Sequence, residues 1–527
     1  MNEASNEADN GASSQQRVDP YSWYVLGILV LVYVLNFVDR QILSILANDI
    51  KADLGLSDAY LGFLYGTAFA VFYALFGIPL GRLADSWHRV RLMTVGLSLW
   101  SLMTAASGFA RSGAMLTGAR IGVGVGEATA SPSAYSLIAD LFPKQMRATA
   151  LAIYSSGLYL GGGLSLLIGG EIVERWNAAY PGGGPLGLVG WQAAFMAVGI
   201  PGLLLAIWVA TIREPVRGAI DGMPTPSDPQ PFKSFFAELL TVIPPLTLIG
   251  AARRGMVPLA LNLLAAAACA LAGWSLTRLT GAATWQQWTF VAVGAYAVFS
   301  WATALRYRDL PTFKLIWGSP AFLCTTLGYG MVSFTAYAAS YWGAPFAERV
   351  FGVAKGELGL WIGGPGALAG FLGVIIGGRM ADVLQARFAT GRVMVVLFGL
   401  VAPIAPVFGA YTATSFVTFA VLSFLGVMLS STALGAAAAA SQALVLPRMR
   451  GTATATFFIA TTLVGLAIGP FMAGYVSTVN NNDLGLGVIS TLAAAPVGIV
   501  LLLAALKLVP LASETVVERA RAAGEAI

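Results

Sequence analysis

Apolar segments of about 20 residues or more recur along this chain from Tyr24 to Leu508, and they limit what it can fold into. A segment of that length can cross the hydrocarbon core of a bilayer as a helix. Only 10% of the 527 residues are charged, well below the roughly 25% of an average soluble domain. Transmembrane barrels consist instead of short segments of alternating polarity. The pattern predicts an all-α polytopic membrane protein embedded in a lipid bilayer.

The apolar segments form two sets of six predicted spans. They lie at 22–48, 58–83, 91–110, 113–141, 146–171 and 190–212, and at 318–346, 357–378, 391–413, 415–445, 452–478 and 484–508. These sets define an N-terminal six-helix bundle at 22–212 and a C-terminal one at 318–508. The tail at 1–21 is polar and we expect it to be disordered, and the segment at 509–527 forms a C-terminal tail.

The linker at 213–317 contains two further apolar runs, at about 256–277 and 285–305. Their length predicts an inserted hairpin that spans the membrane, which would give fourteen helices. The alternative is a pair of helices that lie on the cytoplasmic surface.

The arginines and lysines predict the orientation of the spans. With a cytoplasmic N-terminus, 22 of the 30 lie in cytoplasmic segments, and only Arg40 and Arg120 lie within spans. Because positive charge collects on cytoplasmic loops, we expect both termini in the cytoplasm. The net charge of +5 then reflects topology and does not indicate nucleic-acid binding. The runs rich in Ala, Gly and Arg favour a bacterial inner membrane.

Two short motifs occur once in each set of six spans. Gly-Arg-Leu-Ala-Asp at 81–85 matches Gly-Arg-Met-Ala-Asp at 378–382, and Met-Arg-Ala-Thr-Ala at 146–150 matches Met-Arg-Gly-Thr-Ala at 449–453. This duplication predicts two parallel halves related by an axis along the membrane normal, with a central site between them.

The fourth predicted span carries an arginine and a glutamate at membrane depth. Charged side chains are costly there and usually mark a substrate or proton pathway. Arg120, Gly124, Glu127 and Ser131 share one face of the helix, and small residues on the other face would let a neighbouring helix approach closely. We expect the Arg120–Glu127 stripe to face a water-filled space.

Asn36, Asp39 and Arg40 add further polar groups in the first span. We expect Asp39, Arg120 and Glu127 to form an acid–base cluster, in which Glu127 first and Asp39 second carry a proton. Burial favours the protonated carboxyl and a nearby guanidinium opposes it, so an anion bound at the arginine would change proton occupancy. Arg120, with Arg40 and Asn36, is expected to bind the substrate. Alternatively, Arg40 snorkels or caps locally while Asp39 neutralises a neighbour.

The spans of the second half contain no charged side chain between their end turns, but they are rich in aromatic and hydroxyl groups. We select Tyr329, Ser333 and Tyr337 on the seventh span as candidate substrate-binding residues. A charged wall opposite an aromatic wall suits an amphiphile with an anionic or zwitterionic head. Ordinary helix packing is the alternative role for most of these side chains.

The sequence offers no chemistry that indicates an enzyme, a cofactor or a metal. The single histidine, His88, lies in a loop, and Cys269 and Cys324 fall in predicted spans without other ligands nearby. The glycines at 122, 124 and 126 follow no strand, so they do not form a dinucleotide-binding loop. We therefore expect neither a cofactor nor a metal site, and no enzymatic activity.

Several motifs resemble those of the major facilitator superfamily. The segment 81–89 is similar to its loop between helices two and three, and Arg120 with the neighbouring glycines is similar to its fourth-helix motif. Asn-Phe-Val-Asp-Arg at 36–40 and Gly-Val-Gly-Glu-Ala at 124–128 look like the spinster-type lysolipid and sphingolipid transporters. Organic-anion symporters share the Asn-x-x-Asp-Arg pattern.

The resemblance implies the major facilitator fold and a cytoplasmic gate between its two halves. Asp85 and Arg147, with Arg89 as a weaker candidate, would belong to that gate, and Gly81 would let the eleventh helix approach. Alternatively, Asp85 and Arg147 lie in solvated loops. Ser86 and Val90 stand where the family's motif usually has basic residues, so the charge network is thinner in this chain.

These features predict a monomeric secondary transporter that uses alternating access. Its expected substrate is an amphiphile of the lysolipid or sphingoid-lipid type, and its expected coupling ion is the proton. Two alternatives remain open at this stage: a proton-linked symporter of a small organic anion, and a lipid scramblase.

Overall fold

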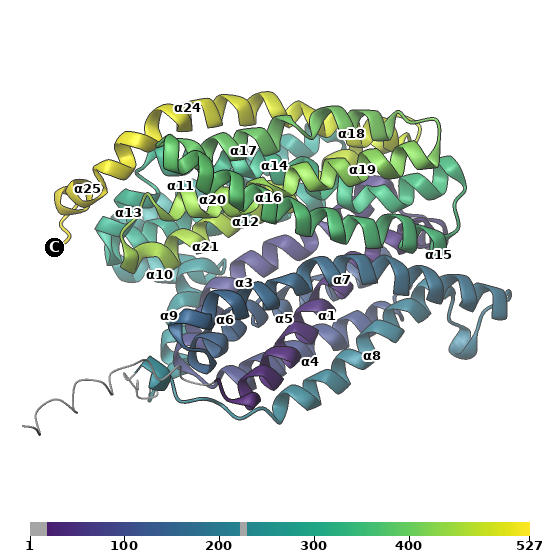
Figure 1. Cartoon of the computed structure of the whole chain (residues 1–527), viewed down its shortest axis with the longest axis horizontal. Coiled ribbons are helices and arrows are strands. Elements are labelled where there is room, and N and C mark those ends of the chain that lie inside the picture. The colour runs from purple at the N-terminus through teal and green to yellow at the C-terminus, as the bar shows by residue number, and fades with distance from the viewer. Residues whose placement is uncertain (1–17, 222–228, 527) are drawn as a thin grey trace, which may run out of the picture.

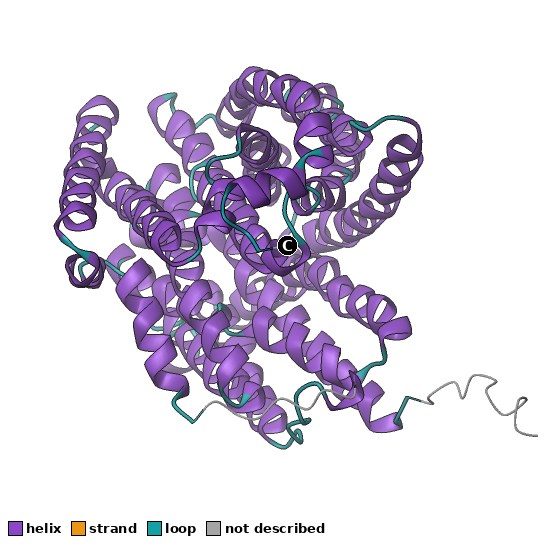
Figure 2. Cartoon of the chain, turned by 90° about the vertical axis from the view of Figure 1, so that its left-hand side faces the viewer, coloured by secondary structure: helices purple, strands orange, loops and turns teal. Residues whose placement is uncertain are grey.

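The computed structural model describes residues 18–221 and 229–526. Within these residues the chain forms helices and loops without any strand (Figures 1 and 2). The predicted tail lies mostly outside the described residues. The expected all-α architecture is confirmed.

Six helical runs make up the first half, and two of them are broken by a short interruption. They are α1 (Pro20–Leu54), α2 (Asp58–Tyr65) with α3 (Thr67–Ser86), α4 (Arg89–Ser107), α5 (Gly113–Glu127) with α6 (Ala130–Leu141), α7 (Lys144–Ala179) and α8 (Gly190–Ala210). The 3-10 turn η1 (Pro185–Gly187) connects α7 to α8.

The second half repeats this arrangement with more interruptions. Its runs are α14 (Pro320–Phe351), α15 (Lys355–Leu358) with η4 (Gly359–Gly363) and α16 (Gly364–Arg387), α17 (Gly391–Val401) with α18 (Ile404–Tyr411), α19 (Phe416–Ser431) with α20 (Ala433–Gln442), η5 (Pro447–Met449) with α21 (Arg450–Ala460), η6 (Thr461–Leu466) and α22 (Gly469–Val479), and α23 (Leu484–Ser490) with η7 (Thr491–Ala493) and α24 (Ala494–Glu514). The C-terminal helix α25 (Val516–Ala522) follows. Because η4 and η6 are π-helical, the helical register changes near the start of the α15–η4–α16 run and midway along the α21–η6–α22 run.

The segment between the halves contains more helix than its sequence predicts. It holds η2 (Ala219–Asp221), α9 (Pro231–Val242), α10 (Leu246–Arg254), α11 (Met256–Thr280), η3 (Ala282–Thr284), α12 (Trp285–Arg308) and α13 (Leu310–Ile316). The helices α9 and α10 were not predicted, since they are short and meet at a bend of 96°. The hairpin α11–α12 corresponds to the predicted insert, and both of its helices are long and apolar enough to cross a membrane.

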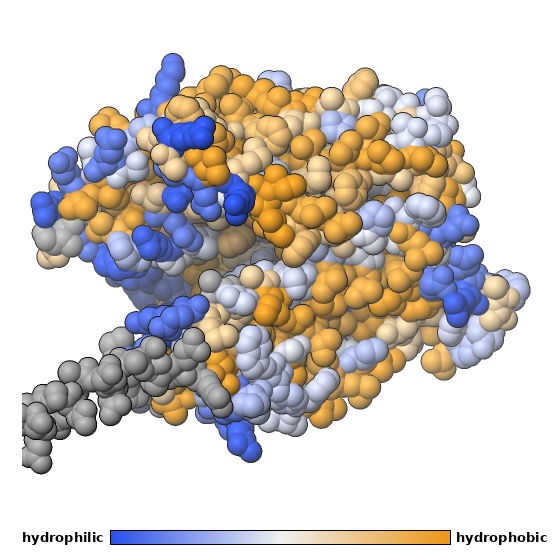
Figure 3. Space-filling model, in the orientation of Figure 1, coloured by the Kyte–Doolittle hydropathy of each residue, from blue (hydrophilic) through white to orange (hydrophobic). Residues whose placement is uncertain are grey.

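Eleven helical runs among the described residues are long and apolar enough to cross a membrane, and up to thirteen if two bent pairs are counted. Two predicted spans, α4 and the α5–α6 run, are not in that number. The α4 helix begins with Arg89 and Arg91, and the α5–α6 run is interrupted at Ala128. Figure 3 shows apolar side chains over the middle of the molecule and hydrophilic ones at its two ends, as a membrane protein requires.

The two halves form the lower and upper lobes of Figure 1, and both described chain ends lie at its left. We call that end the chain-end side and the opposite end, which carries α15, the far side. On the far side the lobes are in close contact: a Cβ on Gly163 of α7 would lie 2.6 Å from the Gly363 carbonyl oxygen, and the reverse also holds. On the chain-end side the surface is hollowed between the lobes (Figure 3).

The close contact at Gly163 predicts how the far side responds to bulk. Gly163→Leu places a side chain against the backbone of η4, so the far side can no longer close. We expect a cysteine reporter at Ala59, which is 7% exposed, to react with maleimide about tenfold faster in that variant. Cys269 and Cys324 are first replaced by serine.

Gly162→Leu is the matched control, because a Cβ at Gly162 meets nothing within 4 Å. It should leave the labelling rate unchanged. Equal rates in the two leucine variants would show that the glycine contact does not hold the far side closed.

Candidate functional site

A buried ion pair joins the first and fourth spans. Arg40 Nη2 on α1 donates to Glu127 Oε2 at the end of α5 over 2.7 Å, and it approaches Asn36 Oδ1 at 3.4 Å. Glu127 is 1% exposed and Arg40 is 8% exposed. Arg40 therefore neither snorkels nor caps locally. It is also the direct partner of Glu127, whereas the sequence grouped Glu127 with Arg120 and Asp39.

Aromatic rings surround the Arg40 guanidinium. Its carbon lies 4.7 Å from the ring centre of Phe37, 4.5 Å from that of Phe69 and 5.2 Å from that of Tyr73. Such contacts are attractive and become stronger when the cation is desolvated. They hold the guanidinium in place without taking up its hydrogen-bond donors.

Arg120 and Asp39 form a second, longer contact next to the Arg40–Glu127 pair. Arg120 Nη1 donates to the backbone oxygen of Asp39 over 3.2 Å, and its guanidinium lies 5.4 Å from the Phe69 ring. The Asp39 carboxylate faces Trp100 and Thr104 of α4. Asp39 is fully buried, and neither of its carboxylate oxygens has a hydrogen-bond partner among the described residues.

The four ionisable residues keep unused hydrogen-bonding capacity. The buried atoms without a partner in the described chain include both Asp39 oxygens, Glu127 Oε1, Arg40 Nε, and Nε and Nη2 of Arg120. Leaving such atoms unpaired costs free energy, so well-ordered cores rarely contain several of them together. The cluster of Asp39, Arg40, Arg120 and Glu127 has two carboxylates, two guanidinium groups and the capacity to exchange partners.

The expected water-filled surface along the Arg120–Glu127 stripe is wrong. A Cβ on Gly124 would lie 2.7 Å from the Phe69 carbonyl oxygen, so this stripe packs against α3, and Arg120 is 1% exposed. The α5 helix also ends at Glu127, which places Ser131 on the separate helix α6. The small opposite face is as predicted: a Cβ on Gly126 would lie 2.8 Å from the Gly96 carbonyl oxygen of α4.

Tyrosines provide the exposed surface beside this cluster. Tyr33, Tyr73 and Tyr337 are half-buried and lie close enough to Arg40 to interact with it electrostatically, and Tyr135 is 42% exposed. They come from α1, α3, α14 and α6, so both halves contribute. The sequence signal for the α1 member was available, because Tyr33, Phe37 and Arg40 recur at the i, i+4, i+7 spacing of one helix face.

The three candidate residues on the seventh span have different environments. Tyr337 belongs to the tyrosines near Arg40. Tyr329 is 8% exposed and stacks on Phe457, with ring centres 5.2 Å apart. Ser333 is 4% exposed and packs against Gly465 of η6. Only Tyr337 is positioned beside the charged cluster, whereas the other two take part in helix packing.

Arg89 is held within the first half and the segment that follows it. It donates to Glu214 Oε1 over 2.7 Å and to the Pro215 oxygen over 2.7 Å, and it forms an ion pair with Asp140. Neither acidic partner was predicted, because Glu214 and Asp140 lie 125 and 51 residues away in the sequence.

The other gate candidates also have partners or neighbours on that side. Arg147 donates to Asp221 Oδ2 over 2.9 Å, Asp85 lies near Arg217, and a Cβ on Gly81 would be 4.0 Å from Pro132. No hydrogen bond or ion pair within the described residues joins these side chains to the second half. Their predicted role as a gate stays a prediction for another conformation.

A polar network that the sequence did not predict connects the halves on the far side. Arg349 of α14 forms two hydrogen bonds of 2.8 Å with the Asp58 carboxylate of α2, and its Nε donates to Asn48 Oδ1 of α1 over 2.6 Å. Lys51 donates to Asp58 over 2.8 Å, and Lys355 lies 3.1 Å from Asp49. A bidentate arginine–carboxylate pair is strong and directional. The halves are therefore joined by charge where they are also closest in backbone packing.

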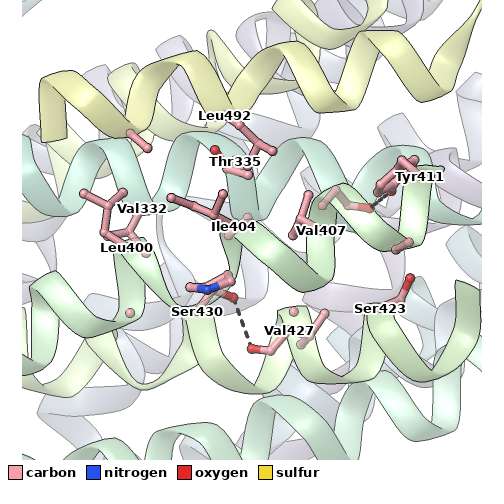
Figure 4. A pocket seen from close by; sticks show the side chains of 17 residues that line it. Val332, Thr335, Leu400, Ile404, Val407, Tyr411, Ser423, Val427, Ser430 and Leu492 are labelled. Atoms are coloured by element: carbon pink, nitrogen blue, oxygen red, sulfur yellow. Dashed lines mark hydrogen bonds between the residues drawn. The ribbon is translucent and has the colours of Figure 1, made fainter. Parts of the chain in front are cut away.

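A separate narrow cavity of about 60 Å³ lies inside the second half (Figure 4). Val332, Leu400, Ile404, Val427 and Leu492 line it, and the Ser430 hydroxyl turns to the Val427 carbonyl oxygen. A water occupies about 30 Å³ in the liquid, so the cavity is too small for a lipid tail. None of its lining residues belongs to the arginine–carboxylate cluster.

Comparisons with known proteins agree with this architecture. A family model described as Major Facilitator Superfamily matches residues 29–354. An MFS-type efflux pump of Mycolicibacterium smegmatis is 27% identical over 88% of this chain and 86% of its own. A probable galactarate/D-glucarate transporter of Bacillus subtilis is 30% identical over 37% of this chain and 41% of its own.

A solved structure of a bacterial homolog to the human lysosomal transporter Spinster, in an inward-facing and unoccupied conformation, has a TM-score of 0.68. It is 26% identical to this chain, and the match covers 95% of this chain and 98% of that one. The predicted family resemblance is confirmed by these matches.

The Arg40–Glu127 pair predicts a non-additive effect of mutation. Arg40→Gln leaves Glu127 buried without its cation, and removing one partner of a buried pair costs about 3–5 kcal/mol. Glu127→Gln should be destabilising for the corresponding reason. The double variant should lose much less stability than the sum of the single variants, as measured by thermal unfolding in detergent.

Arg175→Gln serves as the control, because Arg175 forms an ion pair with Glu171 while its side chain is 83% exposed. Such a surface pair contributes little. Additive losses for Arg40 and Glu127 would contradict a direct pairing in the folded protein.

Proposed function

The chain belongs to the major facilitator superfamily of membrane transporters, and on that premise we propose that it carries an amphiphile of the lysolipid or sphingoid-lipid type by proton-coupled alternating access. The observation that carries this proposal is the buried Arg40–Glu127 pair beside tyrosines from both halves. A cation under aromatic cover suits an anionic or zwitterionic head group, and the tyrosines offer apolar faces with polar ends.

In the proposed mechanism, the head group competes with Glu127 for Arg40. Because a buried carboxylate without a cation is costly, Glu127 takes up a proton when the head group displaces it. Release of the substrate returns Arg40 to Glu127 and expels the proton. Of the two arginines that the sequence suggested for substrate binding, Arg40 rather than Arg120 thus takes the main anion-binding role, and Arg120 supports Asp39 as a second carboxylate available to the proton.

We further propose that the chain-end side faces the cytoplasm of a bacterial cell and that the protein acts as a monomer in the inner membrane. The distribution of arginine and lysine supports this orientation. The far-side network around Arg349 would then close the outer side of an inward-facing conformation. When the cytoplasmic side closes, Asp85, Arg89 and Arg147 would exchange their present partners for contacts with the second half.

A small organic anion is the second candidate substrate. The similarity to a probable galactarate/D-glucarate transporter favours it, although that match covers only 37% of this chain. The same arginine and carboxylates could bind a small carboxylate. The tyrosine-rich surroundings of Arg40 favour the amphiphile.

Transport in proteoliposomes tests the proposed coupling. An imposed pH gradient should drive accumulation of labelled lysolipid by the unmodified protein. Glu127→Gln should abolish gradient-driven accumulation but retain exchange of labelled for unlabelled substrate, since binding at Arg40 survives. Glu171→Gln is the control, because the Glu171 side chain on α7 is 40% exposed and pairs with the exposed Arg175.

Intact gradient-driven accumulation in Glu127→Gln would contradict the assignment of the proton to this residue. Competition by glucarate, without competition by lysolipid, would favour the small-anion symporter. Rapid equilibration that ignores the gradient would indicate a scramblase.

A further inference from the structure

The two halves meet along two seams, one between α3 and the α21–η6–α22 run and the other between α7 and α16. The inserted hairpin occupies the first of them. On α12, Phe290 packs against Phe63 and Phe72 of the first half, with ring centres 5.4 and 5.6 Å apart. Its neighbour Trp288 packs edge-on against Phe471 of the second half at 5.6 Å. The helix therefore contacts both halves at once.

A distinct hydrophobic cluster continues this contact toward the chain-end side. Val71, Ala74 and Leu75 of α3, Val242 of α9, Ala297 and Trp301 of α12, and Ile459 of α21 are all buried in it. A Cβ on Gly294 would lie 3.5 Å from Val71 and 3.3 Å from Leu463. The hairpin is thus packed against both walls of the seam without spare room.

A buried polar contact near the start of α12 fixes the hairpin in the same seam. Gln287 is 1% exposed, and its Nε2 donates to the Ala467 carbonyl oxygen over 3.3 Å. The Thr67 hydroxyl of α3 contacts both Gln287 Oε1 and that carbonyl oxygen. The Gln287 side chain therefore links the first half to the second. At membrane depth an unpaired polar group would be costly, so these contacts are needed.

The opposite seam, between α7 and α16, has no such cover in the described chain. The helices touch at Gly370, which packs against the Tyr159 ring. Toward the chain-end side a Cβ on Gly378 meets nothing within 4 Å, and Ala152 and Ser155 of α7 are exposed. This seam opens in the part of the molecule where the other one is filled.

The outer surface of the hairpin is suited to lipid. Leu264, Leu271 and Trp274 of α11 are 68%, 62% and 58% exposed. The hairpin therefore presents apolar surface outward while its inner helix α12 fills the seam.

We propose that the inserted hairpin is a fixed wedge that seals the seam between α3 and the α21–η6–α22 run and thereby directs membrane-dissolved substrate to the seam between α7 and α16. The route rests on the proposed function, because only a lipid-like substrate would enter from the bilayer. The closure of the α3 seam by the hairpin, which we call the seal, is argued from packing alone and holds for any substrate.

Photochemical labelling by bulk lipid tests the seal independently of transport. The full-length protein is reconstituted in phosphatidylcholine vesicles that contain a diazirine-bearing phosphatidylcholine, and the adducts are mapped by mass spectrometry. We expect adducts near Ser155 and on the outer face of α11, and none at Val71 or Leu463. Adducts at Val71 or Leu463 in the unmodified protein, at the level found near Ser155, would overturn the seal.

Gly294→Phe should displace the wedge and produce adducts at Val71 and Leu463. Ala267→Phe, on an exposed face of α11, adds the same bulk away from the seam and should not. Equal patterns in the two phenylalanine variants would also overturn the seal.

Flux measurements test the route. Gly378→Trp fills the open seam and should lower lysolipid uptake about tenfold, whereas Gly27→Trp, at another open and exposed position, should not. Unchanged uptake in Gly378→Trp would overturn the route. If the unmodified protein carries no lysolipid, the proposed function and the route both fail, while the labelling result on the seal stands.

Discussion

The buried contact between Arg40 and Glu127 is the interaction on which the remainder of the site depends. Two full charges taken out of water are stable only if they meet in good geometry. The chain achieves this by ending α5 at Glu127 and by surrounding Arg40 with Phe37, Phe69 and Tyr73. The rings stabilise the guanidinium without accepting its hydrogen bonds, so another anion can take the place of Glu127. A substrate head group that binds Arg40 must also resolve the charge left on the glutamate, which couples binding to protonation in the proposed mechanism.

The molecule closes one side by two means that reinforce one another. Gly163 and Gly363 bring the backbones of α7 and η4 together, and Arg349 with Asp58 ties α14 to α2. Small residues permit close helix approach in a membrane, where apolar surfaces have no reason to prefer one another over lipid. The Arg349–Asp58 pair lies at the end of the spans, where charged groups lose less hydration than at the membrane centre. On the chain-end side Arg89 and Arg147 are bound to residues of the first half and of the segment that follows it, and no hydrogen bond or ion pair among the described residues ties the gate candidates to the second half.

The membrane made the helices predictable, because the backbone N–H and C=O groups of each span must form hydrogen bonds within that span. The number and approximate positions of the apolar helices, including the hairpin, therefore follow from the apolar pattern, although α7 and α16 extend to Ala179 and Arg387, beyond the predicted limits. Which charged side chains pair with one another does not follow from the apolar pattern. Arg40 rather than Arg120 meets Glu127 because Gly124 lets α3 close over the stripe, a consequence of packing that no helix face reveals by itself. The Arg349–Asp58 contact joins residues 291 positions apart, and the short helices α9 and α10 lack the long apolar pattern that identified the spans.

The most direct test of the account is the number of protons exchanged when substrate binds. Calorimetric titration of lysolipid into the protein, repeated in buffers of different ionisation enthalpy, measures that number without any transport assay. The account predicts net proton uptake on binding by the unmodified protein and none in Glu127→Gln, with binding itself retained. Binding without proton exchange in the unmodified protein, or equal uptake in both proteins, would contradict it.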